Sequence, residues 1–361
     1  MKREKMEKRS KKKVILGMSG GVDSCTASYL LKEQGYDVIG VHIQVWKNNP
    51  HTRKDFSQAI KDAQATADIL NIPLIVFNME RDFQKYVIEY FVKEYESGRT
   101  PNPCVACNRY VKFASLLKKA KEMGIEYIAT GHYARVEQKD GRYLLRKAKD
   151  ESKDQSYVLY NLTQEQLSKT LFPLGMCRKE EVREIAKKVE LDIASKPDSQ
   201  EICFIDDNDH YRFIRDYTNR EPSRGEFVDT QGNVLGYHEG ITKYTIGQRR
   251  GLGISTGKPL FVLDIDIENN RVILGDNDNL FTKEIYAEKL NWISIKELTT
   301  PLKVKAKIRY KAKEASATVE NIGNGKVKVV FNKKQRAATS GQSVVFYNRD
   351  YVVGGGIITT I

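Results

Sequence analysis

The sequence predicts an α/β protein in which a doubly wound parallel sheet is followed by a small mixed central domain and a C-terminal antiparallel β-barrel. Three observations support this prediction. Apolar runs of strand length alternate with segments of helical period from Lys13 to about Thr130. Glycine is frequent from Asp206 to about Phe281, and apolar residues alternate at period two from about Glu284 onward. We therefore expect domains at residues 13–205, 206–283 and 284–361, after a basic disordered tail at residues 1–12.

The first domain contains four apolar runs that we expect to be parallel strands. Helical-period segments at about 59–70 and 111–120 separate them, and Gly35 and Gly124 are expected C-caps. In a doubly wound sheet, ligands bind beyond the carboxyl ends of the strands. The loops after the first and the last of these strands should therefore converge where a nucleotide would bind. The four runs are Val14–Met18, Val38–Ile43, Leu74–Phe77 and Tyr127–Thr130.

A glycine turn, Ser19–Ser24, follows the first expected strand and leads into a helix. Two adjacent glycines and two hydroxyls at a helix start let backbone N–H groups converge on an anion, which the helix dipole also favours. The Walker A pattern is absent, because no lysine closes this loop. The S-G-G-x-D-S pattern instead resembles the PP-loop of ATP pyrophosphatases, in which Asp23 would sit near Mg²⁺ and pyrophosphate. An ordinary turn with a capping serine is the alternative interpretation.

A C-x-x-C pair, Cys104 and Cys107, lies in the segment Gly98–Arg109. Two prolines and a glycine exclude a regular helix through its first half, so we expect the thiols to precede a helical run that starts near Val111. A thiol at a helix N-terminus has a lowered pKa. A zinc site is disfavoured, because the chain has no second C-x-x-C or C/H pair.

Between the first strands and the central domain, the sequence predicts a β-hairpin around Asp140-Gly141, a polar loop at Ser152–Tyr157 and a helix at Glu180–Val189. The polar loop taken alone could be a helix cap only. Cys203 stands alone between apolar residues, and the usual interpretation of such a thiol is a buried structural cysteine.

The two C-terminal domains carry patterns suited to nucleic acid. Lys243–Gly253 combines an aromatic residue with arginines, a composition suited to nucleic-acid backbones. In the last domain, Val304, Ala306 and Ile308 alternate with lysines, which predicts a small barrel with a basic surface. Solvated lysines on any exposed sheet would look the same.

Composition points to a polyanionic partner and a reducing compartment. The formal net charge of this 361-residue chain is +13, and nucleic acid is the first candidate, although a lysine-rich solvated surface gives the same number. The basic leader lacks the apolar core of a signal peptide, and no apolar run approaches the ~18 residues needed to span a membrane. Five cysteines without a secretion signal favour reduced thiols or redox chemistry. We therefore expect a cytoplasmic protein, acting as a monomer and without membrane association.

Seven segments together carry a resemblance that no single one of them could support. They are Ser19–Ser24, Thr100–Asn108, Gly131–Arg135, Lys153–Tyr157, Asp198–Phe204, Tyr244–Gly253 and Gly341–Gly356. In this order the chain closely resembles the tRNA-specific 2-thiouridylase family, bacterial type, over almost its whole length. The resemblance implies that Cys203 is catalytic rather than structural.

The resemblance implies synthesis of 2-thiouridine at the wobble position of tRNA, with ATP and Mg²⁺ as cofactors. ATP would adenylate the C2 oxygen of the uridine. A persulfide on Cys203, loaded by a cysteine desulfurase directly or through a sulfur carrier, would deliver sulfur. Cys107 would complete the transfer by attacking the activated base after sulfide release or the persulfide, leaving a Cys107–Cys203 disulfide. The chemistry independently asks for a low-pKa thiol, because sulfur attacks best as an anion.

The resemblance also assigns the other site residues. It includes no dedicated protein metal site, with Asp23 as the candidate contact to the Mg²⁺ that accompanies ATP. One position departs from the family, since Cys104 stands where aspartate is frequent, so proton transfer by that group cannot be assumed. The implied ATP site comprises Gly17, Met18, Ser19, Gly20, Gly21, Val22, Asp23, Ser24, Ile43 and Gly131. The implied contacts to the base and tRNA are Asn102, Pro103, Cys104, His132, Lys153, Asp154, Gln155, Arg309, Tyr310 and Gln342.

Two other functions compete with this interpretation. Another PP-loop ligase or amidotransferase, acting on an activated carbonyl, would need neither Cys107 nor Cys203. A non-catalytic RNA-binding protein would explain the charge and the β domain, but it would not release pyrophosphate from ATP.

Overall fold

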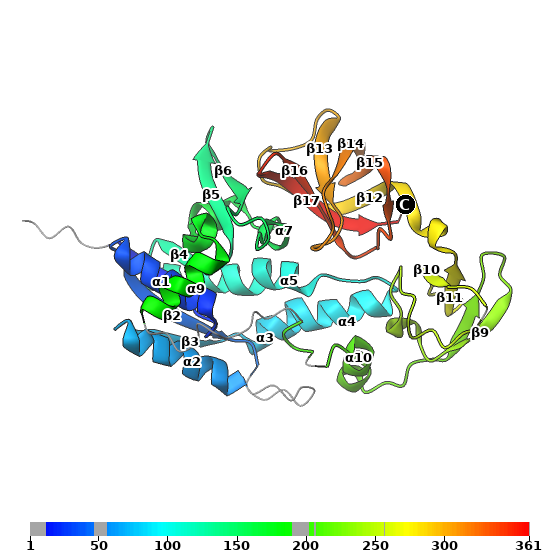
Figure 1. Ribbon diagram of the computed structural model, residues 1–361, viewed down its shortest axis with the longest axis horizontal. Coiled ribbons are helices and arrows are strands. Elements are labelled where there is room, and N and C mark those ends of the chain that lie inside the picture. Colours follow the sequence, from blue (N-terminus) through cyan, green and yellow to red (C-terminus); the bar gives the residue numbers. More distant parts are fainter. Residues whose placement is uncertain (1–11, 47–55, 190–201, 206, 256, 361) are drawn as a thin grey trace, which may run out of the picture.

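The computed structural model describes residues 12–46, 56–189, 202–205, 207–255 and 257–360. The expected tail, apart from residue 12, and the first part of the Asp198–Phe204 motif lie outside these residues. Figure 1 shows a parallel sheet with its helices (blue to green), a barrel (orange to red) and a central domain (green to yellow). No helix in the described ranges is long and apolar enough to cross a membrane.

The predicted parallel sheet is confirmed, with strand order β3-β2-β1-β4-β7. Its central strand β1 is apolar throughout its middle because both faces are covered. Val14 and Leu16 pack into the cluster with α1, α2 and α9, whereas Ile15 packs on the opposite face with α6. The strands are β1 (Lys13–Gly17), β2 (Asp37–Gln44), β3 (Leu74–Asn78), β4 (Tyr127–Thr130) and β7 (Thr170–Leu171).

Helices cover both faces of this sheet, and the two predicted C-cap glycines are confirmed. Gly35 and Gly124 have φ of +85° and +64°, a left-handed conformation that glycine adopts without steric cost. The helix predicted at Glu180–Val189 is α9, and the run 80–96, for which no helix was predicted, is helical as well. The helices here are α1 (Val22–Glu33), α2 (Phe56–Ile69), α3 (Glu80–Phe83), η1 (Gln84–Ile88), α4 (Glu89–Glu96), α6 (Ala114–Glu122), α7 (Ser156–Leu159), α8 (Gln164–Ser168), η3 (Pro173–Met176) and α9 (Lys179–Lys188).

The expectation that the cysteine helix starts near Val111 is wrong. It begins with α5 (Pro103–Ala106) and continues through the π-helical segment η2 (Cys107–Phe113) into α6. Proline at the first position is compatible with a helix start, and the Asn102 side chain accepts a hydrogen bond from the Val105 N–H at 3.4 Å. Both cysteines therefore lie inside the helix. The predicted polar loop similarly ends early, because Ser156 and Tyr157 begin α7.

The predicted hairpin and the predicted barrel are confirmed, but they are parts of one sheet. The hairpin strand β6 pairs with β17 through Arg146 and Tyr351, and β12 pairs with β17 to close the barrel. In the barrel Val304, Ala306 and Ile308 are buried, as the period-two pattern predicts. The strands are β5 (Ala134–Lys139), β6 (Arg142–Lys147), β12 (Phe281–Trp292), β13 (Leu302–Lys307), β14 (Ala315–Gly323), β15 (Lys326–Arg336), β16 (Ser343–Asn348) and β17 (Tyr351–Thr359).

The central domain is small and mixed, as predicted. Its sheet has the order β10-β11-β8-β9 and a core built around Phe227, Tyr244, Val262 and Val272. Tyr211 of α10 donates a hydrogen bond to the Glu239 carbonyl at 3.0 Å and so ties the helix to this sheet. The elements are α10 (His210–Thr218), β8 (Gly225–Val228), β9 (Val234–His238), η5 (Ile241–Lys243), β10 (Phe261–Asp266), β11 (Arg271–Gly275) and η6 (Asn277–Leu280).

Candidate active site

The loop between β1 and α1 is held in a fixed shape by its own polar groups. The Ser19 N–H donates to Ser24 Oγ at 3.1 Å, and Ser24 Oγ–H donates to the Gly21 carbonyl at 3.1 Å. Gly20 has φ of +75°, and a Cβ there would lie 2.5 Å from the Ala59 carbonyl oxygen, so only glycine fits. This geometry directs the start of α1, with its unpaired backbone N–H groups, toward the carboxyl end of the sheet, which suits an anion.

The remaining residues expected at the nucleotide lie beside this loop. Gly17 ends β1, and Met18 connects it to β2 through its N–H, which donates to the Val41 carbonyl at 2.8 Å. Ile43 lies near the carboxyl end of β2. Gly131 follows β4, and a Cβ at that position would lie 2.8 Å from the Ser24 nitrogen. The structure thus brings the loops after β1 and β4 into contact, as the sheet topology predicts.

Asp23 is held by two residues that sequence reasoning missed. Lys179 Nζ donates to both carboxylate oxygens of Asp23 at 2.8 Å, and the Tyr133 hydroxyl donates to Asp23 Oδ1 at 2.7 Å. The Lys179 side chain is 7% exposed and the Asp23 side chain 32% exposed. A lysine from α9 therefore stands beside the glycine loop that carries none itself. Its only sequence signal is a position at the start of a helix, on the same face as the apolar Val182 and Ala186.

These contacts argue against the expected contact between Asp23 and Mg²⁺. The carboxylate is already paired with an ammonium and a hydroxyl, which is a poor environment for a hard cation that needs several oxygen ligands. In the described ranges, no group of three or more His, Cys, Asp or Glu side chains could hold a metal ion. The side chains present do not fit a protein-held Mg²⁺.

Replacing Lys179 with methionine should lower the free energy of unfolding by about 1–2 kcal/mol. This loss of free energy is smaller than the loss expected for a fully buried ion pair, because Asp23 is partly exposed. Urea unfolding measures it, and Lys187→Met at the exposed end of α9 is the control. In the double variant with Asp23→Asn the combined loss should be smaller than the sum of the single losses. Additive losses would contradict a direct pair.

An aromatic cluster on α4, η2 and the segment after 202 contains Cys107 and the residues on either side of Cys203. Cys107 is 7% exposed and belongs to the same buried cluster as Phe91, Val111 and Phe204. The Phe204 ring lies against Phe91 with centroids 5.2 Å apart. Phe204 is buried whereas Cys203 is exposed, so the interpretation of Cys203 as a buried structural cysteine is wrong. Its apolar neighbours anchor the segment, and Cys203 itself stays accessible to solvent.

Burial raises the pKa of Cys107 to about 12, with the nearby Cys203 and Cys104 adding to the rise and Lys112 opposing it. The expectation of a lowered pKa at this helix start is therefore wrong. Cys107 lies in the second turn, inside an apolar cluster, where loss of water outweighs the helix dipole. Cys104, on the first turn, is exposed.

Lys112 is the cation of this cluster, and sequence reasoning missed it. Burial opposes its charge, but Cys107, Cys104 and Cys203 together raise its pKa. In a π-helix the backbone bonds join residues five apart, so η2 places Lys112 over Cys107. In an α-helix the two would lie on different faces. The sequence carries no signal for the π-helical turn.

His132, which follows β4, also faces this cation. Burial and the charge of Lys112 lower the pKa of His132 to about 3. Its Nδ1 lies 2.8 Å from Thr130 Oγ1. At neutral pH the imidazole is therefore uncharged, which suits it to contact an uncharged nucleobase.

The polar loop 153–155 is built by its own side chains. Asp154 accepts hydrogen bonds from the N–H groups of Ala148 and Ser156 at 3.0 and 3.2 Å. Gln155 Oε1 accepts the Tyr133 N–H at 2.9 Å. Lys153 is half-buried at the loop's outer edge. These contacts give the loop one shape and tie it to Tyr133, which also holds Asp23.

Of the three barrel residues expected at tRNA, Tyr310 and Gln342 contact the first domain, whereas Arg309 bonds within the barrel. The Tyr310 hydroxyl donates to the Asp154 carbonyl at 3.3 Å, and an Arg309 N–H donates to the Arg336 carbonyl at 3.0 Å. The Gln342 side chain donates to the Thr100 carbonyl in the loop before α5, so it is not directed only toward solvent. Asn102 and Pro103 form the start of α5.

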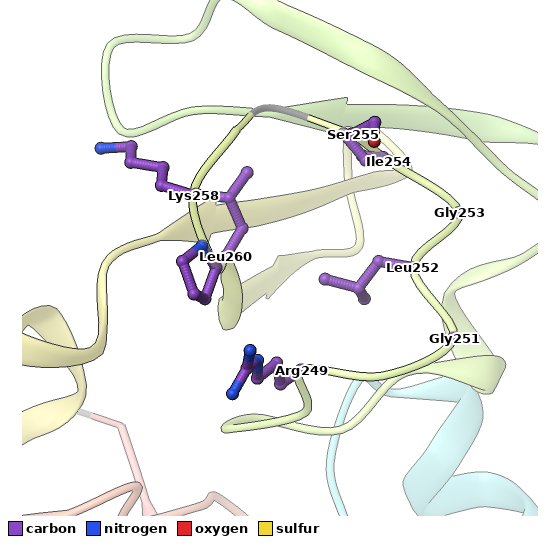
Figure 2. Close-up of a pocket in the computed structure, with 9 residues that line it drawn as sticks. Arg249, Gly251, Leu252, Gly253, Ile254, Ser255, Lys258 and Leu260 are labelled. Atoms are coloured by element: carbon purple, nitrogen blue, oxygen red, sulfur yellow. The ribbon is translucent and has the colours of Figure 1, made fainter.

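A cavity of about 420 Å³ lies in the central domain, distant in sequence from the glycine loop. Figure 2 shows Arg249 and Lys258 at the two ends of the loop around it. Both are exposed, and Lys258 pairs with Asp276 at 3.1 Å. The Lys243–Gly253 segment predicted to suit a nucleic-acid backbone thus borders a basic hollow.

Comparisons with known proteins cover nearly the whole chain. Three family models match, described as a tRNA methyl transferase HUP domain at residues 12–207, a tRNA methyl transferase PRC-barrel domain at 211–276 and an aminomethyltransferase β-barrel domain at 282–358. The chain is 56% identical over 357 residues to the tRNA-specific 2-thiouridylase MnmA of Acetivibrio thermocellus, covering 97% of this chain and 99% of that one. It is 53% identical over 361 residues to the protein of that name from Clostridium perfringens, covering 98% and 99%.

A solved structure is similar at a much lower level. The U34-tRNA thiolase NcsA from Methanococcus maripaludis is 19% identical, covers 58% of this chain and 71% of its own, and gives a TM-score of 0.35. That likeness is too low to bear on function.

Proposed function

Since this chain is a member of the tRNA-specific 2-thiouridylase family, a family of tRNA-modifying enzymes, we propose that it makes 2-thiouridine with Cys107 and Cys203 as its two sulfur-handling groups. The assignment of these two residues rests on the aromatic cluster that contains both Cys107 and Phe204, the neighbour of Cys203. Cys107 and the neighbours of Cys203, far apart in sequence, pack together near the carboxyl ends of β2 and β3, and Cys203 is close enough to add to the rise of the Cys107 pKa.

The first half-reaction uses ATP at the loop after β1. The C2 oxygen of the wobble uridine attacks the α-phosphate, pyrophosphate leaves, and the base becomes an adenylated electrophile. The backbone N–H groups at the start of α1 stabilise the phosphates, and Ile43 and Gly131 line the nucleotide. Mg²⁺ arrives with the nucleotide, and no step here depends on a protein ligand to it.

The second half-reaction moves one sulfur atom. A persulfide on the exposed Cys203, loaded by a cysteine desulfurase or a sulfur carrier, supplies it. In one route the Cys107 thiolate attacks Cys203 Sγ, releases hydrosulfide and forms a disulfide, and the hydrosulfide displaces AMP from C2. In the other route the persulfide displaces AMP first and Cys107 then cleaves its S–S bond. Both routes leave a Cys107–Cys203 disulfide that an external dithiol must reduce.

The outer parts of the molecule suit tRNA. The loop 153–155, Arg309 and Tyr310 lie on the barrel side of the cysteine helix, and the hollow near Arg249 adds positive charge at a distance. Polar and basic groups spread over two domains suit a long polyanion better than a small substrate. We propose that one copy of the chain suffices, because each catalytic group named here comes from the same chain.

Incubation of the reduced protein with unmodified tRNA, ATP and a persulfide donor tests this function. We expect 2-thiouridine by mass spectrometry of the digested tRNA, with pyrophosphate released in proportion. Pyrophosphate without thiouridine would favour another PP-loop ligase or amidotransferase. Absence of both products would favour a non-catalytic RNA-binding protein.

A further inference from the structure

The segment that leads into the cysteine helix is held from two sides. On one side Gly98, with φ of +63°, packs against the central domain, and a Cβ there would lie 3.1 Å from Ile267 Cγ1 and 3.2 Å from Ile265 Cγ2. The next residue, Arg99, forms a bidentate pair with the buried Glu94 at 2.7 Å for both bonds. The entry to the helix is thereby fixed to α4 and to the central domain.

On the other side the barrel holds the same segment through its backbone. The Thr100 N–H donates to the Ser340 carbonyl at 2.9 Å. The Gln342 side-chain N–H₂ donates to the carbonyls of Thr100 and Pro101 at 3.0 and 3.3 Å. Gly341 lies so close that a Cβ would be 2.9 Å from both the nitrogen and the oxygen of Thr100. The barrel loop 340–342 thus closes on residues 100–101.

This clasp lies immediately before the residues that do the chemistry. Asn102, next in the chain, caps α5, and Cys104 and Cys107 follow within the first two turns. In Figure 1 the barrel lies above α5, with the central domain to the right of the α4–α5 turn. Residues 100–101 are bonded to the barrel loop and directly precede the cap residue Asn102. A shift of the barrel loop should therefore move the start of α5.

From this geometry we infer that Gln342 is a positioning residue for Cys107. The reactivity of the Cys107 thiol then depends on the barrel even in protein without tRNA. The inference rests on the proposed function only for the role of Cys107. It differs from the direct tRNA contact that the family resemblance assigns to Gln342, since its amide hydrogens already bond protein carbonyls.

The test compares Gln342→Ala and Gly341→Ala in the full chain, with Gln335→Ala as the matched control because the Gln335 amide bonds carbonyls of its own strand. Two readouts are needed. One is the rate at which iodoacetamide alkylates Cys107 in protein without tRNA, followed by peptide mass spectrometry. The other is the separate measurement of kcat and of KM for tRNA.

For Gln342→Ala we expect Cys107 alkylation to rise about three- to tenfold, the effect of losing one or two hydrogen bonds. Gly341→Ala, whose Cβ would press on the backbone of Thr100, should raise it as well. The kcat of thiolation should fall by a similar factor, with KM for tRNA within about twofold of wild type. Unchanged alkylation with a raised KM would overturn the inference and leave Gln342 as an RNA contact. Unchanged alkylation and kinetics would overturn both roles. Because alkylation needs no turnover, failure of the proposed function would be recognised separately, by a wild-type protein that makes no thiouridine.

Discussion

Changing Cys107 or Cys203 to serine should reduce 2-thiouridine formation to below about one thousandth of wild type. A serine hydroxyl neither carries a persulfide nor attacks one at neutral pH. ATP-dependent release of pyrophosphate should persist, because the loop at Ser19–Ser24 is separate from both thiols. The measurement is mass spectrometry of tRNA from a strain that lacks the gene and is complemented with each variant.

Cys177→Ser is the matched control, since that thiol is half-buried against the opposite face of the sheet and should be dispensable. Cys104→Asp should retain thiolation, and its loss would indicate an essential redox pair between Cys104 and Cys107. Full thiolation in either Cys107→Ser or Cys203→Ser would refute the assigned chemistry.

Replacing Lys112 with methionine should lower the thiolation rate at pH 8 by at least about tenfold. Lys112 opposes the rise of the Cys107 pKa, which already reaches about 12 through burial and neighbouring thiols. Without the ammonium that pKa rises further, and each unit removes nine-tenths of the remaining thiolate. Lys112→Arg keeps the charge and should recover most of the rate.

The pH dependence of Cys107 alkylation shows the direction in which Lys112 shifts the pKa of this thiol. Below a pKa of about 12 the thiolate fraction of Cys107 increases tenfold per pH unit, so its alkylation rate should rise steadily from pH 7 to pH 10. In Lys112→Met the whole curve should move to higher pH. Lys118→Met, at an exposed position on α6, should leave it in place. Identical curves for wild type and Lys112→Met would show that Lys112 does not act on the thiol.

The elements that could be predicted are those specified by local pattern. The middle of β1 is an apolar run because both faces of the sheet are covered there, and the barrel strands alternate because one face meets solvent. The glycine loop was recognisable because its backbone conformation requires glycine. Gly20 illustrates this, with a positive φ and a carbonyl 2.5 Å from where a Cβ would be.

The errors came from interactions between distant segments. Cys203 was interpreted as buried from its apolar neighbours, yet those neighbours anchor the segment to Phe91 and leave the thiol outside. The pKa of Cys107 was expected to fall at a helix start, but the helix begins earlier and burial dominates. No pattern in the sequence indicated that the hairpin joins the barrel sheet, where Arg146 pairs with Tyr351 and bonds Asp350.

By itself the sequence determined the architecture and the chemical groups: a glycine turn suited to phosphate, thiols at 104, 107 and 203, and two C-terminal domains suited to RNA. Only the tertiary structure decided which groups act on one another. It placed Lys179 on Asp23, Lys112 over Cys107 and Gln342 on the entry to the cysteine helix. Pairs such as these are set by packing and by a π-helical turn, which depend on the whole fold and leave no periodic mark in the chain.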